Sequence, residues 1–290
     1  MRRFSRLLCS LLISVLSVAG AEDILVQGSI SPLNNEPTFN HGYLAVYEEK
    51  GMSVYAPSGS LAMKISSPDG AHIVNADIDV DGSVAVVTDG MRPRLGAILL
   101  FHPDGSPGGR IETGWLEPSQ VCFAPDHSIW TLGMESRVPM SEHTDYFLLK
   151  HYSRDGQVLG RYFPRSSFAP SPGAGPGGLN EGGWQLRIAN GRIGVLLVAV
   201  GENERPLWLE TDLTGKETGR WTVTSDGGPG AMTDSGTVYF QGTGISTLDR
   251  ASGKWKESPK SPDTILLGAE GDTLVFGVRG TNRLHRAMFP

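Results

Sequence analysis

The chain has 290 residues, with 25 Lys and Arg against 31 Asp and Glu, so its formal net charge is −6 at pH 7. This acidic balance argues against a role in binding nucleic acid or an anionic lipid surface, because both select basic protein surfaces. The 38 glycines and 19 prolines fall mainly between short apolar runs, and no stretch has a sustained helical period. The composition predicts an all-β protein with many turns.

Residues 1–21 have the three parts of a secretory signal peptide. Three arginines lie among the first six residues, an apolar stretch follows at 7–18, and Ala-Gly-Ala at 19–21 matches the small-residue cleavage pattern. The apolar stretch is shorter than the roughly 20 residues of a membrane helix. We therefore expect cleavage after residue 21 and export of one soluble domain, 22–290, to the periplasm or the cell exterior.

One of the two cysteines lies in the expected signal peptide, which leaves only Cys122 in the mature chain. No intramolecular disulfide can then form. Cys122 stands in an apolar strand pattern, which favours a buried, inert thiol over a nucleophile. The lack of disulfides in an exported domain of this size favours a bacterial origin.

A short turn that ends in glycine recurs between pairs of apolar strands. The final glycine of such a turn adopts positive φ, and an Asp or Asn supports the turn through local hydrogen bonds. The copies are APSG at 56–59, DVDG at 79–82, HPDG at 102–105, SRDG at 153–156, DLTG at 212–215, TDSG at 233–236 and RASG at 250–253. This recurrence predicts a repeat architecture.

The turns divide the chain into repeats of four short strands. In chain order, the repeats are 38–66, 72–113, 119–163, 184–223, 230–258 and 263–290. The last has only three strands, and 24–30 reads as a strand without a partner, so we expect the two ends of the chain to complete one blade and close a ring. Six repeats give about 44 residues each, as is usual for four-stranded propeller blades.

Three of the turns also carry a known repeat pattern. They are Asp-Val-Asp-Gly at 79–82 followed by Val84, Phe-His-Pro-Asp-Gly at 101–105, and Tyr-Ser-Arg-Asp-Gly at 152–156. The pattern resembles that of the six-bladed β-propellers of the NHL and TolB-like kind, in which an Asp-Gly turn precedes an apolar strand and another strand ends in Phe-x-Pro-Asp-Gly. The resemblance implies an all-β, six-bladed propeller of four-stranded antiparallel blades, without indicating a subfamily.

In a propeller whose strands are named a to d from the axis outward, the a–b and c–d turns lie on one face, here called the turn face. The b–c and d–a connections lie on the opposite loop face. The long connections all belong to the second set, at 89–96, 134–145, 165–183 and 278–283. Insertions on one face of a repeat scaffold indicate its binding face. The Gly- and Pro-rich loop 165–183 is either a lid or a flexible insertion.

The candidate binding residues lie on this loop face. They are Arg92, Arg94, Trp115, Arg137, Asn180, Glu181, Arg205, Arg279 and Arg283. Arginine suits a carboxylate or phosphate, and an exposed tryptophan can stack on a sugar or a peptide. The leading hypothesis is a monomeric, non-catalytic module, without a cofactor, that binds a protein, peptide or glycan. A purely structural module of an envelope complex is a further alternative.

An enzymatic alternative places chemistry in the central channel. Some six-bladed propellers, such as the gluconolactonase type, hold a divalent metal there with Glu, Asn and Asp, and this analogy suggests Glu36, Asn75 and Asp77 as ligands of calcium or another divalent cation. Gln120, Gln185 and Arg187 are further polar residues on the expected inner strands, where a water-filled channel also accounts for them. Candidate acid–base groups are His72 and His143, the latter with Glu142 or Asp145. The alternative is thus a hydrolase or lyase.

Residues 77–82 also match the first half of a calcium-binding loop, but Thr88 stands where the second half requires an acid. No nucleophile elbow, Walker loop or dinucleotide fingerprint is present in the sequence.

Overall fold

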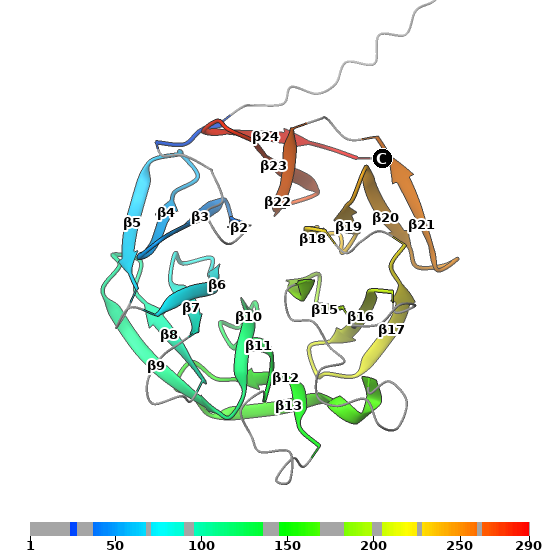
Figure 1. The fold of residues 1–290 in the computed structure, drawn as a ribbon, viewed down its shortest axis with the longest axis horizontal. Coiled ribbons are helices and arrows are strands. Elements are labelled where there is room, and N and C mark those ends of the chain that lie inside the picture. Colours follow the sequence, from blue (N-terminus) through cyan, green and yellow to red (C-terminus); the bar gives the residue numbers. More distant parts are fainter. Residues whose placement is uncertain are drawn as a thin grey trace, which may run out of the picture.

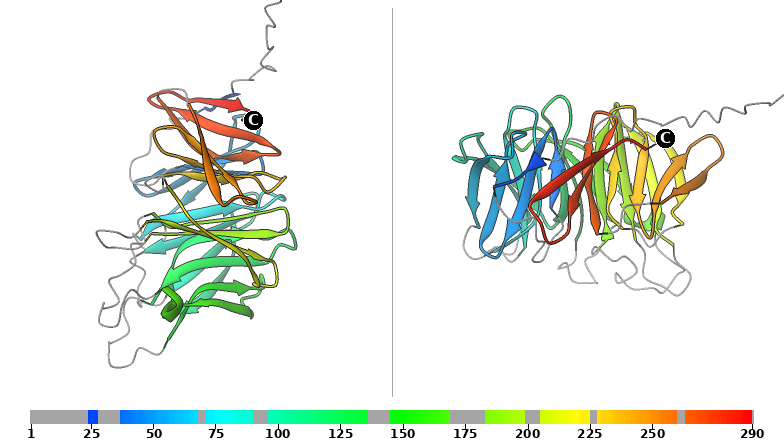
Figure 2. Two further views of the ribbon diagram at one scale, coloured as in Figure 1. Left: turned by 90° about the vertical axis from the view of Figure 1, so that its right-hand side faces the viewer. Right: turned by 90° about the horizontal axis from the view of Figure 1, so that it is seen from above.

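The computed structural model describes residues 24–27, 37–67, 71–89, 96–135, 145–168, 183–198, 205–224, 228–259 and 263–289. Six four-stranded antiparallel sheets stand around a central axis like the blades of a propeller (Figure 1). Seen from the side, the ring is a flattened disc (Figure 2). The expected six-bladed fold is confirmed, whereas the expected signal peptide lies outside the described residues. No helix within the described ranges is long and apolar enough to cross a membrane.

The blades follow one another along the chain, and each starts at the axis. Blade 1 holds β2 (Thr38–Asn40), β3 (Tyr43–Glu48), β4 (Gly51–Tyr55) and β5 (Leu61–Ser66), and blade 2 holds β6 (His72–Ile78), β7 (Val84–Asp89), β8 (Gly96–Phe101) and β9 (Pro107–Gly114). Blade 3 holds β10 (Glu117–Phe123), β11 (Ile129–Met134), β12 (Phe147–Tyr152) and β13 (Val158–Pro164), and blade 4 holds β14 (Gln185–Ala189), β15 (Arg192–Leu197), β16 (Leu207–Asp212) and β17 (Glu217–Thr222). Blade 5 holds β18 (Gly230–Met232), β19 (Val238–Gln241), β20 (Ile245–Asp249) and β21 (Lys254–Ser258).

Blade 6 joins the two ends of the chain. It holds β22 (Thr264–Glu270), β23 (Thr273–Val278), β24 (Arg283–Ala287) and, on the outside, β1 (Ile24–Leu25). Ile24 pairs with Leu284, and the Val26 amide donates to the carbonyl of Asn282 at 2.8 Å. The ring is therefore closed as the sequence predicted, because the outermost strand of the last blade comes from the start of the chain.

The short turns have the backbone that the sequence predicts. Gly59, Gly82, Gly105, Gly156, Gly215, Gly236 and Gly253 all have positive φ, from +68° to +90°. In blade 2 the Gly82 amide donates to the Asp79 carbonyl at 2.9 Å, which closes the turn. Blade 3 has His127 in the equivalent place, at φ +65°, a conformation that few residues other than glycine adopt.

The hydrophobic core lies between neighbouring blades. One cluster packs Met52 and Val54 of blade 1 against Ile78 and Val84 of blade 2, and the others repeat this arrangement around the ring. Strands that are covered on both faces lose their polar alternation, and β4 is accordingly buried along its whole length. The fully buried side chains also include Trp130, Trp184 and Trp208.

The connection that begins at residue 165 starts with η3 (Arg165–Phe168), a turn of 3-10 helix. Phe168 packs edge-on against Phe163 at 5.8 Å, and the Arg220 guanidinium lies over its ring at 5.2 Å. Phe168 therefore lies against blades 3 and 4. Residues 169–182, which hold the rest of the expected lid or insertion, lie outside the described residues.

Candidate functional site

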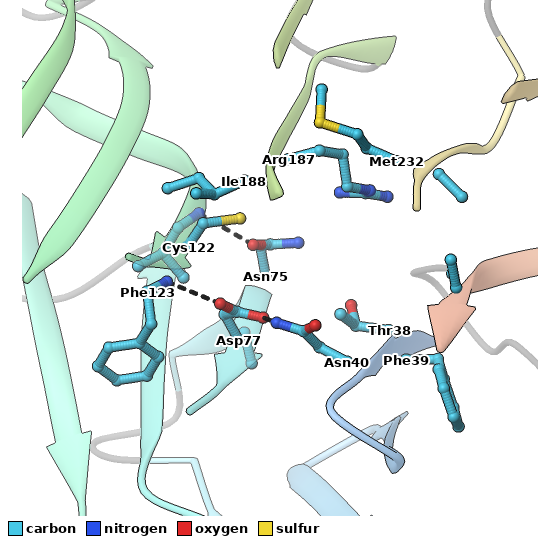
Figure 3. Close-up of a pocket in the computed structure, with 15 residues that line it drawn as sticks. Thr38, Phe39, Asn40, Asn75, Asp77, Cys122, Phe123, Arg187, Ile188 and Met232 are labelled. Carbon is cyan, nitrogen blue, oxygen red and sulfur yellow. Dashed lines mark hydrogen bonds between the residues drawn. The ribbon is translucent and has the colours of Figure 1, made fainter. Parts of the chain in front are cut away.

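The inner strands of all six blades enclose a cavity of about 40 Å³ on the axis of the ring (Figure 3). A water molecule needs about 10–15 Å³ of such space, so the cavity suits a few waters or one small chemical group. Its polar lining consists of Thr38, Asn40, Asn75, Asp77, Cys122 and Arg187.

The cavity lies toward the turn face. Asn40 is the last residue of β2, Asp77 is the penultimate residue of β6, and Arg187 is two residues from the end of β14. Each of these strands runs from the loop face into an a–b turn. The leading hypothesis from the sequence placed binding on the opposite, loop face, whereas the enzymatic alternative named Asn75 and Asp77 in the channel.

Asp77 joins the inner strands of three consecutive blades. Its side chain is buried, with one oxygen accepting from Asn40 Nδ2 at 2.8 Å and the other from the Phe123 amide at 2.7 Å. Burial raises the pKa of the Asp77 carboxyl, and these two hydrogen bonds oppose the rise. Both carboxylate oxygens therefore have structural partners.

Asn75 lies two residues before Asp77, on the same face of β6. Its Oδ1 accepts from the Val121 amide at 3.0 Å. Because a backbone N–H needs an acceptor, this contact fixes which end of the side-chain amide is oxygen. Nδ2 therefore faces the cavity, and it has no hydrogen-bond partner among the described residues (Figure 3).

Arg187 brings a positive charge to the cavity wall. Its Nε donates to the Gly230 carbonyl of blade 5 at 3.0 Å, and Nη1 donates to the Leu186 carbonyl at 2.8 Å. These bonds hold the plane of the guanidinium, whose end points into the space between the inner strands (Figure 3). Nη2 has no hydrogen-bond partner within the described part of the chain.

Two further titratable groups, one in the cavity lining and one behind it, are held in their protonated forms. The Cys122 thiol is buried and donates to the Leu186 carbonyl at 3.1 Å, and burial raises its pKa well above the usual range. Burial also raises the pKa of Tyr47 to about 12, while its hydroxyl accepts from the Ala76 amide at 2.9 Å. Neither group is poised to act as a nucleophile at neutral pH.

These donor atoms do not fit the divalent cation of the enzymatic alternative. The described lining has one carboxylate, and Asp77 and Asn75 use their side-chain oxygens to accept from backbone or amide groups. Calcium takes 6–8 oxygen ligands, and zinc takes His, Cys or carboxylate ligands in a tetrahedron. Glu36, the third suggested ligand, lies outside the described residues.

A group of metal-binding residue types does occur on the turn face. Asp79, Asp81 and His127 have side-chain atoms within 4.8 Å of one another. The two aspartates already have basic partners: His127 Nδ1 lies 2.7 Å from Asp79, and Arg154 lies 3.7 Å from Asp79 and 3.5 Å from Asp81. This arrangement joins the turns of blades 2 and 3.

The residues predicted for the loop face are described in part. Trp115 is 53% exposed, and Arg205, Arg279 and Arg283 are exposed on loop-face connections or at strand ends. Arg92, Arg94, Arg137, Asn180 and Glu181 lie outside the described residues.

The predicted acid–base residues are also described only in part. His143 and Glu142 lie outside the described ranges. His72 is exposed at the start of β6, while Asp145 accepts from the Ser166 amide at 2.9 Å and so fastens η3 to blade 3.

Asn40 was not among the site residues predicted from the sequence, although the spacing of polar residues could have indicated it. Polar residues two positions apart recur on the inner strands, as Asn75 with Asp77 and Gln185 with Arg187, and a period of two places both on one face of a strand. Thr38 and Asn40 repeat this spacing on β2. Asn40 then contacts Asp77, which is 37 residues away.

Neither a protein-family model nor a curated protein matches the chain. Among solved structures, a gluconolactonase from Xanthomonas campestris is similar over 94% of this chain and 91% of its own, at 14% identity and a TM-score of 0.55. Virginiamycin B lyase from Staphylococcus aureus (12% identity, 93% and 99% coverage, TM-score 0.49) and TolB from Acinetobacter baumannii (14%, 85% and 63%, 0.48) are further neighbours. At 14% identity the likeness to the gluconolactonase concerns the fold, and it agrees with the six-bladed propeller predicted from the sequence.

Proposed function

We propose that the chain is an exported, non-catalytic propeller that binds a protein, peptide or glycan across its loop face. Export is inferred from the signal-peptide pattern of residues 1–21. The binding role is supported by a contrast between the two faces of the ring and by the chemistry of the channel.

The observation that carries the proposal is the setting of Trp115. Its side chain is 53% exposed on the short connection between β9 and β10. The next residue, Leu116, is fully buried, and its carbonyl accepts from Thr113 Oγ1 at 2.7 Å. A large aromatic side chain on a fixed backbone loses little conformational freedom on binding, which is the usual property of an interface anchor.

On the turn face, three of the described aspartates bond to their own turns. Asp104 accepts from the Ser106 amide at 2.9 Å, Asp126 from Ser128 at 3.0 Å, and Asp212 from Thr214 at 2.9 Å. Hydrogen bonds from the side-chain hydroxyls of the same partners are the largest cause of the lowered pKa of each carboxyl. These aspartates have a structural role.

The channel supports the same assignment. A hydrolase or lyase requires a metal, a general base or a nucleophile, whereas the described lining offers a hydrogen-bonded Asp77, a protonated Cys122 and a fixed Arg187. Binding therefore accounts for the described residues better than catalysis does.

The test starts from a search for a ligand on an array of peptides and glycans, using purified residues 22–290. The strongest binder is then titrated against Trp115→Ala and against the double variant Arg279→Ala/Arg283→Ala. Val80→Ala is the matched control, because Val80 is 64% exposed on the turn face. We expect Trp115→Ala to weaken binding about tenfold or more, and Val80→Ala to leave it unchanged.

Wild-type affinity in both loop-face variants would place the site elsewhere. Conversion of the bound probe to a product would favour the enzymatic alternative.

A further inference from the structure

The axial cavity offers free hydrogen-bond donors, while its side-chain acceptors are occupied. The two oxygens of Asp77 accept from Asn40 and from the Phe123 amide. Oδ1 of Asn75 accepts from the Val121 amide. Asn75 Nδ2 and Arg187 Nη2 are left without partners among the described residues. A cavity with this lining favours a ligand that accepts hydrogen bonds.

The charge of Arg187 also favours a ligand that accepts hydrogen bonds. The guanidinium forms hydrogen bonds to two carbonyls and no ion pair with any described residue. Asp77, the one carboxylate among the described lining residues, has both oxygens turned toward N–H donors of blades 1 and 3 and forms no ion pair with Arg187. A partly buried cation that forms no ion pair with a described residue favours an anion as the occupant of the space before it.

We propose that this cavity binds one carboxylate group, held by Arg187 and Asn75. A carboxylate is small enough for a space of about 40 Å³. It presents two acceptor oxygens, which match one guanidinium N–H and one amide N–H. The two donor side chains project from β14 and β6. Hydrogen bonds to blade 5 and blade 3, respectively, hold them in place.

The carboxylate can belong to a small free acid or to the C-terminus of a peptide, because both present the same group. The site is distinct from the loop face, since its residues lie toward the a–b turns. It goes beyond the proposed function, and loss of either site leaves the other in place.

The experiment is a titration of ¹⁵N-labelled residues 22–290 with acetate at pH 7, following the Nε–H signal of Arg187 by NMR. Acetamide, a neutral molecule of the same shape, is the ligand control. Asn75→Asp is the main variant, because it keeps an acceptor for the Val121 amide and replaces the free donor with a negative oxygen. Asn190→Asp is its matched control, since Asn190 lies on the turn face and donates to the Ser235 carbonyl at 3.0 Å.

We expect saturable acetate binding to the wild type and to Asn190→Asp, at least about tenfold weaker binding to Asn75→Asp, and no effect of acetamide. Arg187→Lys, which keeps the charge but loses the planar donor, is expected to bind acetate more weakly than the wild type. A short peptide with a free C-terminus, compared with its C-terminal amide, then distinguishes the two sources of the carboxylate. Equal acetate affinity of Asn75→Asp and the wild type would overturn the proposal. Binding of inorganic phosphate but not of acetate, or an acetate titration that does not saturate, would also overturn it.

Discussion

Asp77 and Asp104 belong to the same blade and have opposite roles. Asp104 is exposed and accepts from Ser106, two residues away, whereas Asp77 is buried and accepts from Phe123, 46 residues away in the next blade. The pKa of Asp104 is lowered by the hydrogen bonds of its turn, and the pKa of Asp77 is raised by burial. Exposed aspartates close the turns, while buried carboxylates join the blades.

Glu210 gives the largest expected difference between the two kinds of carboxylate. It is fully buried on β16 and accepts from Arg250 Nη2 at 2.7 Å, from Trp208 Nε1 at 2.9 Å and from Arg192 Nη1 at 3.3 Å. Glu210→Ala should lower the free energy of unfolding by about 3 kcal/mol, the lower end for a broken buried ion pair, because Arg250 retains some contact with water. Urea unfolding measures this value. Glu217→Ala breaks the exposed pair with Arg220 and should cost less than about 1 kcal/mol.

Asp77→Ala should give the second largest effect. It leaves the buried Phe123 amide without an acceptor, which costs about 1–3 kcal/mol. Asp104→Ala is the control within the same blade and should change the urea midpoint much less. Equal shifts in the two variants would contradict the distinction between blade-joining and turn-closing carboxylates.

Gly82 tests the turns through the backbone. Its φ is +84°, and an added Cβ would lie 3.3 Å from the Tyr43 hydroxyl. Gly82→Ala should cost about 1–2 kcal/mol in thermal or urea unfolding, because L-residues are disfavoured at this φ. Gly108→Ala, where φ is not in the left-handed region, is the matched substitution and should be close to neutral. A neutral Gly82→Ala would mean that the turn relaxes without loss.

The pH dependence of stability should separate the two kinds of aspartate. Asp104, Asp126 and Asp212 have lowered pKa values, so their contribution is present above the unfolded value near 4 and is lost as the pH falls through their folded values. Asp77 has a raised pKa, so it takes up a proton in the folded state first, and its contribution to stability increases as the pH falls through that folded value.

Stability curves from pH 7 to pH 3 for the wild type and Asp77→Asn provide the measurement. The wild type should gain stability relative to this variant as the pH is lowered, although both lose stability overall in the acid range. A difference that does not change with pH would contradict the raised pKa of Asp77.

The difference between local and long-range contacts also explains what the sequence could predict. The turns are local, so short motifs that end in glycine predicted the glycines at positive φ, and counting strands predicted that residues near Ile24 complete the last blade. Asn40 and Asp77 meet only through the order and register of two blades, which no short motif specifies. Glu210 could be noticed as a charge in an apolar strand, but its partner Arg250 belongs to a turn of the next blade.

The proposed function as a binding module implies that the channel holds no catalytic metal. Metal analysis of purified residues 22–290, combined with Tm before and after treatment with a chelator, tests it most directly. We predict no stoichiometric divalent cation and an unchanged Tm, because the described channel oxygens already accept hydrogen bonds. One equivalent of calcium or zinc, whose removal lowers the Tm, would contradict the account.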